Sequence, residues 1–413
     1  MLLQDAGYRT YMAGKWDLGM SGAYTPAQRG FDRSFAMLSA SASHTAEYFR
    51  SDMILYEEDG VGVHVDDLAD DWYSTRAYTD KVLEYLHAHA EDAPWFTYLT
   101  YTAPHWPLQV PDDWLDRYAG RYEAGYDVLR EERVARAQGL GVLPPGAQLE
   151  QYEPGAPSWT SLSAEEQREF ARAQEIYAAM VEYMDASVGR IIDYLDASGQ
   201  RDNTLIFFMS DHGASASGIR RQFPNGLAGN DNSFENFGRM GSFIDHGRGF
   251  AEAATAPFRY FKGTLNEGGL RAAAFVSYPE SIPSGVSHEF VTVMDILPTF
   301  LEIAGQPHPG AGDYHRRHIN GIRGRSMWPH LKGESATVHT ATDAAGWTLR
   351  DAGALVRGSH KIINVPSPGS EGVTQTSWRL YDLDEDPGEA RDLAAEFPEI
   401  VNELVEEWET NWR

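Results

Sequence analysis

The sequence predicts an α/β fold, with a largely parallel central sheet covered by helices and a small α+β subdomain after it. Residues 204–209, TLIFFM, are apolar on both faces, which is typical of a strand buried inside a parallel sheet. Predicted strands alternate with predicted helices up to about residue 335, and short strands with one final helix follow. We therefore expect a main domain over residues 1–335 and a C-terminal subdomain, an antiparallel sheet with one helix, over residues 336–413.

The clearest single element is a helix over residues 164–198. Ser163 and Glu166 have the spacing of a capping box, in which each side chain binds the backbone N–H of the other residue. Gly199 ends the helix. Apolar residues recur at helical spacing along it, and we expect them in the core. These residues are Ile176, Met180, Met184, Val188, Ile191 and Leu195.

The other expected elements are shorter. Strands are predicted over residues 8–15, 95–101, 269–278, 353–356, 361–365 and 378–381. Helices are predicted over residues 291–304 and 399–412. Residues 119–157 are expected to cross the surface without regular structure. Residues 214–261 show no clear period, and so long a loop inside a compact domain is usually functional.

The composition excludes several classes of partner. The chain has 413 residues and a net charge of −27, so its surface repels nucleic acid and anionic lipid, whose phosphates are bound by Lys and Arg. We expect no nucleic-acid partner. The sequence holds no run of the roughly 18 apolar residues that a membrane span needs, so we expect no membrane partner either. An anionic substrate would need a local positive site against this overall charge.

The chain contains no cysteine, which excludes disulfides and cysteine-bound zinc. Its first seven residues, MLLQDAG, lack the basic and apolar segments of a signal peptide. They resemble the end of a helix capped by Gly7, so we expect the chain to begin inside a domain. The compartment, whether periplasmic, extracellular or cytoplasmic, stays open.

Candidate functional residues follow the predicted strands, where α/β sheets place their ligands. Lys15 follows the first strand and can direct a compact positive charge at an anion, although a surface lysine after a turn is more common. His105 lies between two prolines that fix an extended backbone and suits proton transfer, or it is a histidine satisfied within a loop. Asp211 and His212 directly follow the apolar strand and suit a divalent cation, or a helix cap beside an incidental histidine.

The glycine-rich segment 262–271, KGTLNEGGLR, is the most distinctive candidate. Its glycine pair allows tight backbone turns, and Lys262 and Arg271 flank it with positive charge. An ordinary charged loop before a strand is the alternative interpretation.

Together these segments resemble the type I sulfatases of the alkaline phosphatase superfamily, and most closely the bacterial arylsulfatases. The resemblance implies an alkaline phosphatase-like fold and hydrolysis of small-molecule sulfate esters. The residues match the family motifs in order, over nearly the whole chain. The matching segments are 7–19 (G-Y-x-T…G-K-W-x-L-G), 30–32 (G-F-D), 103–107 (A-P-H-x-P), 210–213 (S-D-[NH]-G), 262–271 (K…E-G-G-x-R), 294–299, 324–326 and 380–387.

The resemblance assigns a role to each candidate residue. Asp211 and His212 would bind a divalent cation, calcium above all, although many members have Asn in place of His212. Lys15 and Lys262 would hold the sulfate oxygens, and His105 would protonate or polarise the leaving oxygen. The family usually has His where this chain has Asp17. A carboxylate there could accept a proton but supplies no positive charge.

A second departure from the family pattern is larger. The nucleophile of the family is a formylglycine made from Cys or Ser in [CS]-x-P-x-R, and the chain contains no such segment. The paired aspartates of the first strand of the family are absent too. We expect both in a missing N-terminal segment. Without that strand, two sheet edges would be unpaired beside an open apolar slot, so we expect the 413-residue chain alone to be insoluble or inactive.

Two other functions fit the same segments. One is a phosphodiesterase or phosphonate monoester hydrolase of the same superfamily, because sulfate esters and phosphate diesters have similar geometry. The other is a catalytically inactive fragment that retains metal binding. Relative turnover of sulfate and phosphate esters distinguishes the phosphodiesterase or phosphonate hydrolase from a sulfatase. A metal-dependent rise in melting temperature without turnover would identify the inactive fragment.

Overall fold

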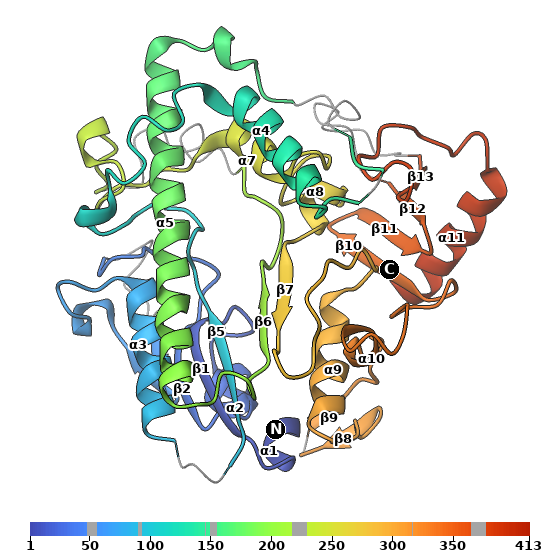
Figure 1. The fold of residues 1–413 in the computed structure, drawn as a ribbon, viewed down its shortest axis with the longest axis horizontal. Coiled ribbons are helices and arrows are strands. Elements are labelled where there is room, and N and C mark those ends of the chain that lie inside the picture. Colours follow the sequence, from blue (N-terminus) through green and yellow to red (C-terminus); the bar gives the residue numbers. More distant parts are fainter. Residues whose placement is uncertain are drawn as a thin grey trace.

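The structure is a computed structural model of the chain, drawn in Figure 1. It describes residues 1–47, 56–89, 93–144, 146–148, 155–216, 229–315, 317–364 and 377–413. The expected strand ending at residue 365 reaches one residue outside these ranges, and part of the segment 214–261 also lies outside them.

The larger sheet is mixed, with a parallel centre. Its order is β4-β3-β2-β1-β5. The strands β1 (Arg9–Lys15), β2 (Arg33–Met37) and β5 (Trp95–Thr100) run parallel. The hairpin of β3 (Tyr56–Glu58) and β4 (Val61–Val63) adds two antiparallel strands at the β2 edge. The predicted strands at 8–15 and 95–101 are confirmed.

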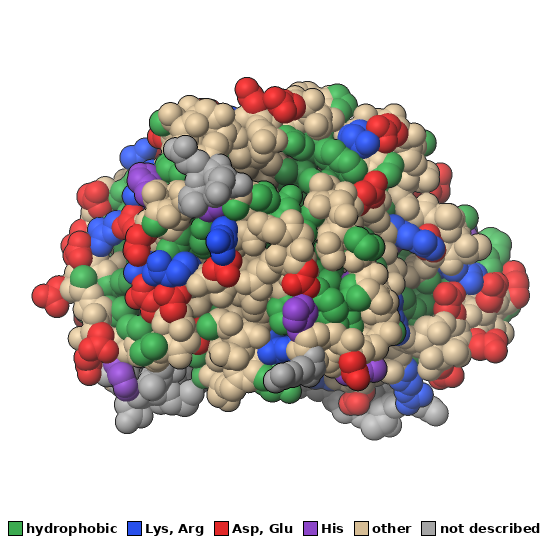
Figure 2. Space-filling model, turned by 90° about the horizontal axis from the view of Figure 1, so that it is seen from below, with side chains coloured by type: hydrophobic (Ala, Val, Ile, Leu, Met, Phe, Trp, Pro, Cys, Tyr) green, Lys and Arg blue, Asp and Glu red, His purple; other side chains and the backbone are tan. Residues whose placement is uncertain are grey.

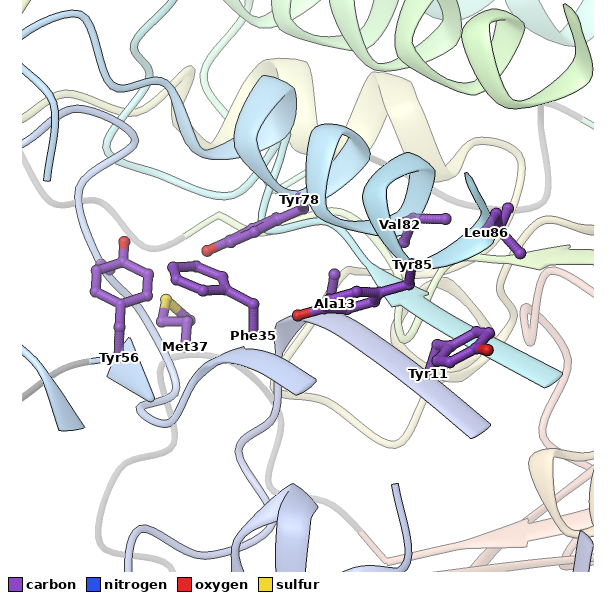
Figure 3. Close-up of a cluster of buried hydrophobic side chains, with 10 residues drawn as sticks. Tyr11, Ala13, Phe35, Met37, Tyr56, Tyr78, Val82, Tyr85 and Leu86 are labelled. Atoms are coloured by element: carbon purple, nitrogen blue, oxygen red, sulfur yellow. The ribbon is translucent and has the colours of Figure 1, made fainter. Parts of the chain in front are cut away.

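The helix α3 (Ser74–His87) packs on this sheet. Its buried aromatic and aliphatic side chains meet those of β1, β2 and β3, as Figure 3 shows. The β1 side chains alternate between this core and the opposite face, where Met12 packs with Trp16. Burial on both faces fixes the register of β1, and hence the position of the residues that follow it.

The long helix α5 (Ala164–Ala197) confirms the predicted helix, including its capping box between Ser163 and Glu166. Ile176, Met180 and Leu195 are buried, as expected. Three other positions expected in the core, however, are only half-buried and line a cavity. They are Met184, Val188 and Ile191.

The strand β6 (Ile206–Met209) differs from the prediction. It was expected inside a parallel sheet, but it pairs antiparallel with β7 (Ala274–Ser277) in a two-stranded sheet, and all four of its residues are half-buried. Among the described residues, the other edge of β6 and the outer edge of β5 pair with no strand. The two unpaired edges beside an apolar space that the sequence led us to expect are therefore present.

The C-terminal sheet confirms the predicted α+β character of this part of the chain. Its antiparallel strands are β10 (Ala344–Leu349), β11 (Ala352–Arg357), β12 (His360–Ile363) and β13 (Arg379–Asp382). The helix α11 (Pro398–Asn411) covers one face through Leu404 and Trp408. Figure 1 shows this unit beside β7 and α9 (Ile296–Ile303), and the boundary near residue 335 stays a prediction.

Two segments expected to be irregular contain helices. α4 (Gly125–Gly139) lies within 119–157, and α7 (Gly247–Thr255) lies within 214–261. They pack together through Tyr126 and Phe250. Arg, Glu and Gly obscure the apolar period of these helices, and the tertiary contact stabilises them. The remaining elements are α1 (Leu2–Asp5), α2 (Pro26–Arg29), α8 (Glu267–Leu270), β8 (Gly312–Tyr314), β9 (Arg317–Ile319), α9 (Ile296–Ile303) and α10 (Trp328–Leu331).

The surface agrees with the composition. Figure 2 shows acidic side chains spread around the periphery of one face, with basic side chains between them. No helix within the described ranges combines the length and apolarity needed to cross a bilayer.

Candidate active site

A single large cavity of about 4180 Å³ holds the candidate site. Side chains of β5, β6, α5 and α9 make its walls, most of them apolar. Lys15, Asp17, His105, Asp211 and His212 line it as well. Five of the six residues singled out in the sequence therefore share one cavity, at the carboxyl ends of β1, β5 and β6.

Lys15 is the last residue of β1, and its side chain is 20% exposed. The preceding Gly14 has φ +115°, and a Cβ there would lie 1.9 Å from the carbonyl oxygen of Thr100. Thr100 also donates its hydroxyl to the carbonyl of Lys15 at 2.6 Å. The glycine thus lets β1 and β5 approach closely, and this contact fixes the direction of Lys15.

His105 lies in a turn after β5 rather than in the extended backbone expected, because its N–H donates to the carbonyl of Thr102. Its Nδ1 lies 2.7 Å from the carbonyl oxygen of Trp106, which can only accept, so Nδ1 carries the proton. Burial, helped by the positive charges of Lys262 and Lys15, lowers the pKa of His105 to about 4. The imidazole is neutral at pH 7, with an unprotonated Nε2.

Lys262 lies next to this nitrogen. Its Nζ lies 3.4 Å from Nε2 of His105, and the ammonium donates to that lone pair. Its backbone N–H donates to the carbonyl of Ala214, which ties the segment 262–271 to the residues after β6. Burial and the nearby Lys15 ammonium lower the pKa of Lys262. The two lysines predicted to bind one anion therefore do lie near each other.

Asp211 and His212 follow β6 as predicted, and they face each other. Nε2 of His212 lies 3.1 Å from Oδ2 of Asp211, while Lys15 Nζ lies 3.9 Å from the same oxygen. Desolvation works against the charge of Asp211, but the His212 imidazole and the Lys15 ammonium outweigh it and lower the pKa of Asp211 to about 2. This carboxylate is ionised at any physiological pH.

The pair fits part of a metal site. His212 Nδ1 lies 2.8 Å from the carbonyl oxygen of Gly213 and donates to it, while its Nε2 lies 3.1 Å from the Asp211 carboxylate. A cation belongs between two such groups. A divalent cation takes four or more ligands, and within the described residues no group of three or more His, Cys, Asp or Glu is arranged so that it could hold a metal ion. The two residues therefore suit a metal but complete no coordination sphere.

Asp17 lies at the mouth of the same cavity. Its side chain is exposed, and its φ of +50° is a left-handed conformation that Asp, Asn and His tolerate better than most residues. Its charge acts on Lys262 and favours the protonated lysine. The position therefore accepts Asp or His on backbone grounds.

The residues that support the backbone of His105 were not predicted from the sequence. His44 is fully buried, accepts from the Ser74 hydroxyl at Nδ1 and donates from Nε2 to the carbonyl of His105 at 2.9 Å. Gln109 binds the backbone N–H of His44. Nothing in the local sequence indicated these roles. His246 is a buried residue that lines the same cavity and stacks on the ring of Tyr177.

Comparisons with known proteins show which family this chain is similar to. The sequence model described as Sulfatase matches residues 1–306. An uncharacterized sulfatase of Schizosaccharomyces pombe is 41% identical over 98% of this chain and 75% of its own length. An arylsulfatase of Klebsiella aerogenes is 37% identical over 73% of this chain and 66% of its own length.

Solved structures show the same fold. A protein in complex with D-glucosamine-2-N,6-O-disulfate as its substrate has a TM-score of 0.59 at 21% identity, covering 99% of this chain and 80% of that one. The phosphonate monoester hydrolase of Silicibacter pomeroyi has a TM-score of 0.56 at 18% identity, covering 99% and 79%. With the family match over most of its length and a relative at 41% identity, this chain belongs to the sulfatase family.

Proposed function

We propose that this protein hydrolyses small-molecule sulfate monoesters, as an arylsulfatase-like enzyme. The observation that carries the proposal is that Lys15, His105, Asp211 and His212 line one cavity, with the Lys262 ammonium 3.4 Å from Nε2 of His105. Two ammonium groups, a neutral imidazole and a carboxylate–imidazole pair form a local positive site within an acidic protein. Such a site matches an anionic ester against the net charge of −27.

The positive groups act on the charge that develops during the reaction. Cleavage of a sulfate ester places negative charge on the leaving oxygen and on the sulfuryl oxygens. Lys15 and Lys262 hold the latter, and each fixed ammonium in a partly buried site is worth on the order of 3 kcal/mol of transition-state stabilisation. Asp17 works against this attraction, and its exposure to solvent screens its charge.

His105 and Lys262 act as a pair. Because Nε2 of His105 is unprotonated at pH 7 and accepts from the Lys262 ammonium, the mobile proton at rest is on the lysine. We propose that His105 and Lys262 together present this proton to the leaving oxygen. A general acid of this kind contributes about 10²–10⁴ in rate. The anionic substrate favours the protonated pair.

The nucleophile is proposed to come from a segment that the 413 residues do not contain. The family uses formylglycine, and this chain has neither a cysteine nor the [CS]-x-P-x-R segment. The unpaired edges of β5 and β6, with an apolar cavity lined by both, would accept one further strand and satisfy its N–H and C=O groups. A formylglycine at the carboxyl end of that strand would lie near Lys15 and Asp211.

We propose a divalent cation at Asp211 and His212, with the remaining ligands from the same additional strand. The cation would neutralise the sulfuryl oxygens and hold the substrate in place. Calcium is the first candidate from the family resemblance, and the carboxylate of Asp211 suits it. The imidazole of His212 also suits a transition metal, so the test compares both kinds of ion.

A chimera tests the function directly. The residues of the Klebsiella arylsulfatase that precede its region of similarity are fused to this chain and expressed in a host that makes formylglycine. We expect the chimera to hydrolyse p-nitrophenyl sulfate, and the 413-residue chain alone to be insoluble or inactive. The control is the chimera with His105→Ala, which should retain its fold and lose about 10²–10⁴ in kcat.

Two outcomes would contradict the proposal. One is a soluble, folded chimera that carries formylglycine and turns over no sulfate ester. The other is sulfatase activity in the 413-residue chain alone. To identify the metal ion, calcium, manganese and zinc are added separately to the chelator-treated chimera and the restored activities are compared. Calcium should restore the most activity if Asp211 dominates the site.

The phosphonate monoester hydrolase of Silicibacter pomeroyi supports a second candidate function, because its fold covers 99% of this chain. The 37% identity to an arylsulfatase favours sulfate esters. Relative kcat/KM of the chimera for p-nitrophenyl sulfate and for p-nitrophenyl phenylphosphonate decides between them. A preference for the phosphonate would reverse the assignment. A chimera that binds metal without any turnover would be the inactive alternative.

A further inference from the structure

A buried cluster of charges joins the C-terminal sheet to the segment that carries Lys262. Lys361 of β12 is completely buried, and its Nζ lies 2.8 Å from Oε1 of Glu267 and 2.9 Å from Oε1 of Glu389. The other carboxylate oxygen of Glu267 pairs with Arg271 at 2.9 Å. Two acidic and two basic groups therefore balance, and three of the four side chains are at most 7% exposed.

The charges in this cluster depend on one another. Burial opposes the ammonium of Lys361, but the two carboxylates outweigh burial and raise its pKa. Burial likewise opposes the Glu267 carboxylate, but Lys361 and Arg271 outweigh it, so the pKa of Glu267 is lowered. Burial raises the pKa of Glu389. Removing Lys361 would leave two buried carboxylates with Arg271 alone.

Glu389 connects this cluster to the backbone of the loop. Its Oε2 accepts from the side-chain amide of Asn266 at 3.0 Å and from the backbone N–H of Glu267 at 2.9 Å. Its own carbonyl accepts from the Arg259 guanidinium at 2.8 Å. One residue of the C-terminal region therefore holds the chain at one point before Lys262 and at two points after it.

The same loop is locked to the residues that carry the metal pair. Gly213, next to His212, donates its N–H to the carbonyl of Gly269, and a Cβ on Gly213 would lie 1.9 Å from the carbonyl oxygen of Gly268. Gly268 donates to the carbonyl of Arg259 at 2.8 Å. A displacement of the loop thus moves Lys262 and the metal segment together.

We propose that Lys361 and Glu389 are positioning residues, through which the C-terminal sheet sets the placement of Lys262 and of the Asp211–His212 pair. The inference rests on the proposed function for its catalytic meaning, but the geometric coupling stands apart from it. The C-terminal sheet is then a part of the active-site architecture rather than an appended unit.

Hydrogen–deuterium exchange of the soluble chimera tests the coupling without any turnover. Lys361→Met is compared with Arg357→Met, which removes an ion pair with Glu403 and Glu407 inside the same C-terminal sheet and helix, away from the loop. We expect Lys361→Met to speed exchange at least tenfold in peptides spanning 211–216 and 259–271. Arg357→Met should speed exchange only within β11 and α11.

Two more variants separate positioning from general destabilisation. Lys361→Arg keeps the charge and should restore slow exchange at least in part. Lys361→Met combined with Glu389→Gln removes one charge of each sign, so its loop should exchange more slowly than that of Lys361→Met alone. In the chimera, Lys361→Met should lower kcat/KM for p-nitrophenyl sulfate tenfold or more at a temperature where the fold persists, with Arg357→Met near the parent value.

The proposal fails if Lys361→Met and Arg357→Met give the same exchange pattern, or if residues 259–271 keep their protection in Lys361→Met. If a chimera that carries Lys361 shows no activity, the proposed function fails while the exchange result still decides the coupling. If Lys361→Met does not fold, Glu389→Gln replaces it, because this substitution keeps the size of the side chain. Its exchange is then compared with that of Arg357→Met, and a smaller increase is expected in the same peptides.

Discussion

Lowering the pH should destabilise this protein through its buried histidines, and His44 allows the size of the effect to be worked out. Burial lowers the pKa of His44 to about 4, from 6.5 in the unfolded chain. Between these values the unfolded chain binds a proton that the folded chain does not. The stability contributed by the neutral side chain is therefore present above pH 6.5 and is lost as the pH falls toward 4.

The magnitude follows from the difference of about 2.5 pKa units, each worth about 1.36 kcal/mol, which gives about 3 kcal/mol lost by His44 alone. His246, also buried, has its pKa lowered to about 4 by the same cause and should add a similar loss. Replacing His44 by Gln keeps a donor for the carbonyl of His105 but removes the titrating group. The variant should lose about 3 kcal/mol less than the parent between pH 7 and pH 4.

Urea unfolding at several pH values, followed by tryptophan fluorescence in the soluble chimera, measures these differences. His44→Gln should start about 1–2 kcal/mol less stable at pH 7, because the hydroxyl of Ser74 loses its acceptor. The two stability curves should therefore cross as the pH falls, and at pH 4 the variant should be about 1–2 kcal/mol more stable than the parent. Parallel curves for parent and variant would refute the reasoning, since they would mean that His44 is protonated in the folded state or is accessible to water.

Three further predictions concern single side chains. Lys262→Met in the chimera should lower kcat by about 10²–10³ while a thermal melt shows the fold intact, and unchanged kcat would remove Lys262 from the mechanism. Gly14→Ala should destabilise the chain by about 3 kcal/mol or more, because the added Cβ would clash with Thr100. Gly7→Ala should cost only about 1 kcal/mol, because its Cβ meets nothing within 4 Å. Equal melting temperatures for the two variants would contradict this prediction. Ser163→Ala should cost about 1 kcal/mol through loss of the helix cap, and no change in the melting temperature would contradict it.

The sequence predicted those elements whose cause is local. The helix α5 was predicted because Ser163 and Glu166 cap it and its apolar residues repeat within it. The strands β1 and β5 were predicted because short apolar runs end at glycine or proline. In α4 and α7, by contrast, helicity depends on Tyr126 and Phe250 meeting between two distant segments, and a local pattern carries no signal of that contact.

The prediction for β6 was wrong for the same kind of reason. A run such as IFFM indicates burial on both faces, but which strands flank it is decided by the rest of the sheet. In this chain β6 has β7 on one side and the cavity on the other. Its apolar character is retained although its four residues are only half-buried.

The sequence by itself determined which residue types this protein can use: a lysine, a histidine and an Asp–His pair after predicted strands, and a second lysine in a glycine-rich segment, with no thiol anywhere in the chain. Only the tertiary structure decided that Lys262 faces Nε2 of His105 and that His44 and Lys361 hold the loops behind them. Chemical identity is a property of each position. Proximity across 157 residues depends on how strands, helices and buried charges pack together.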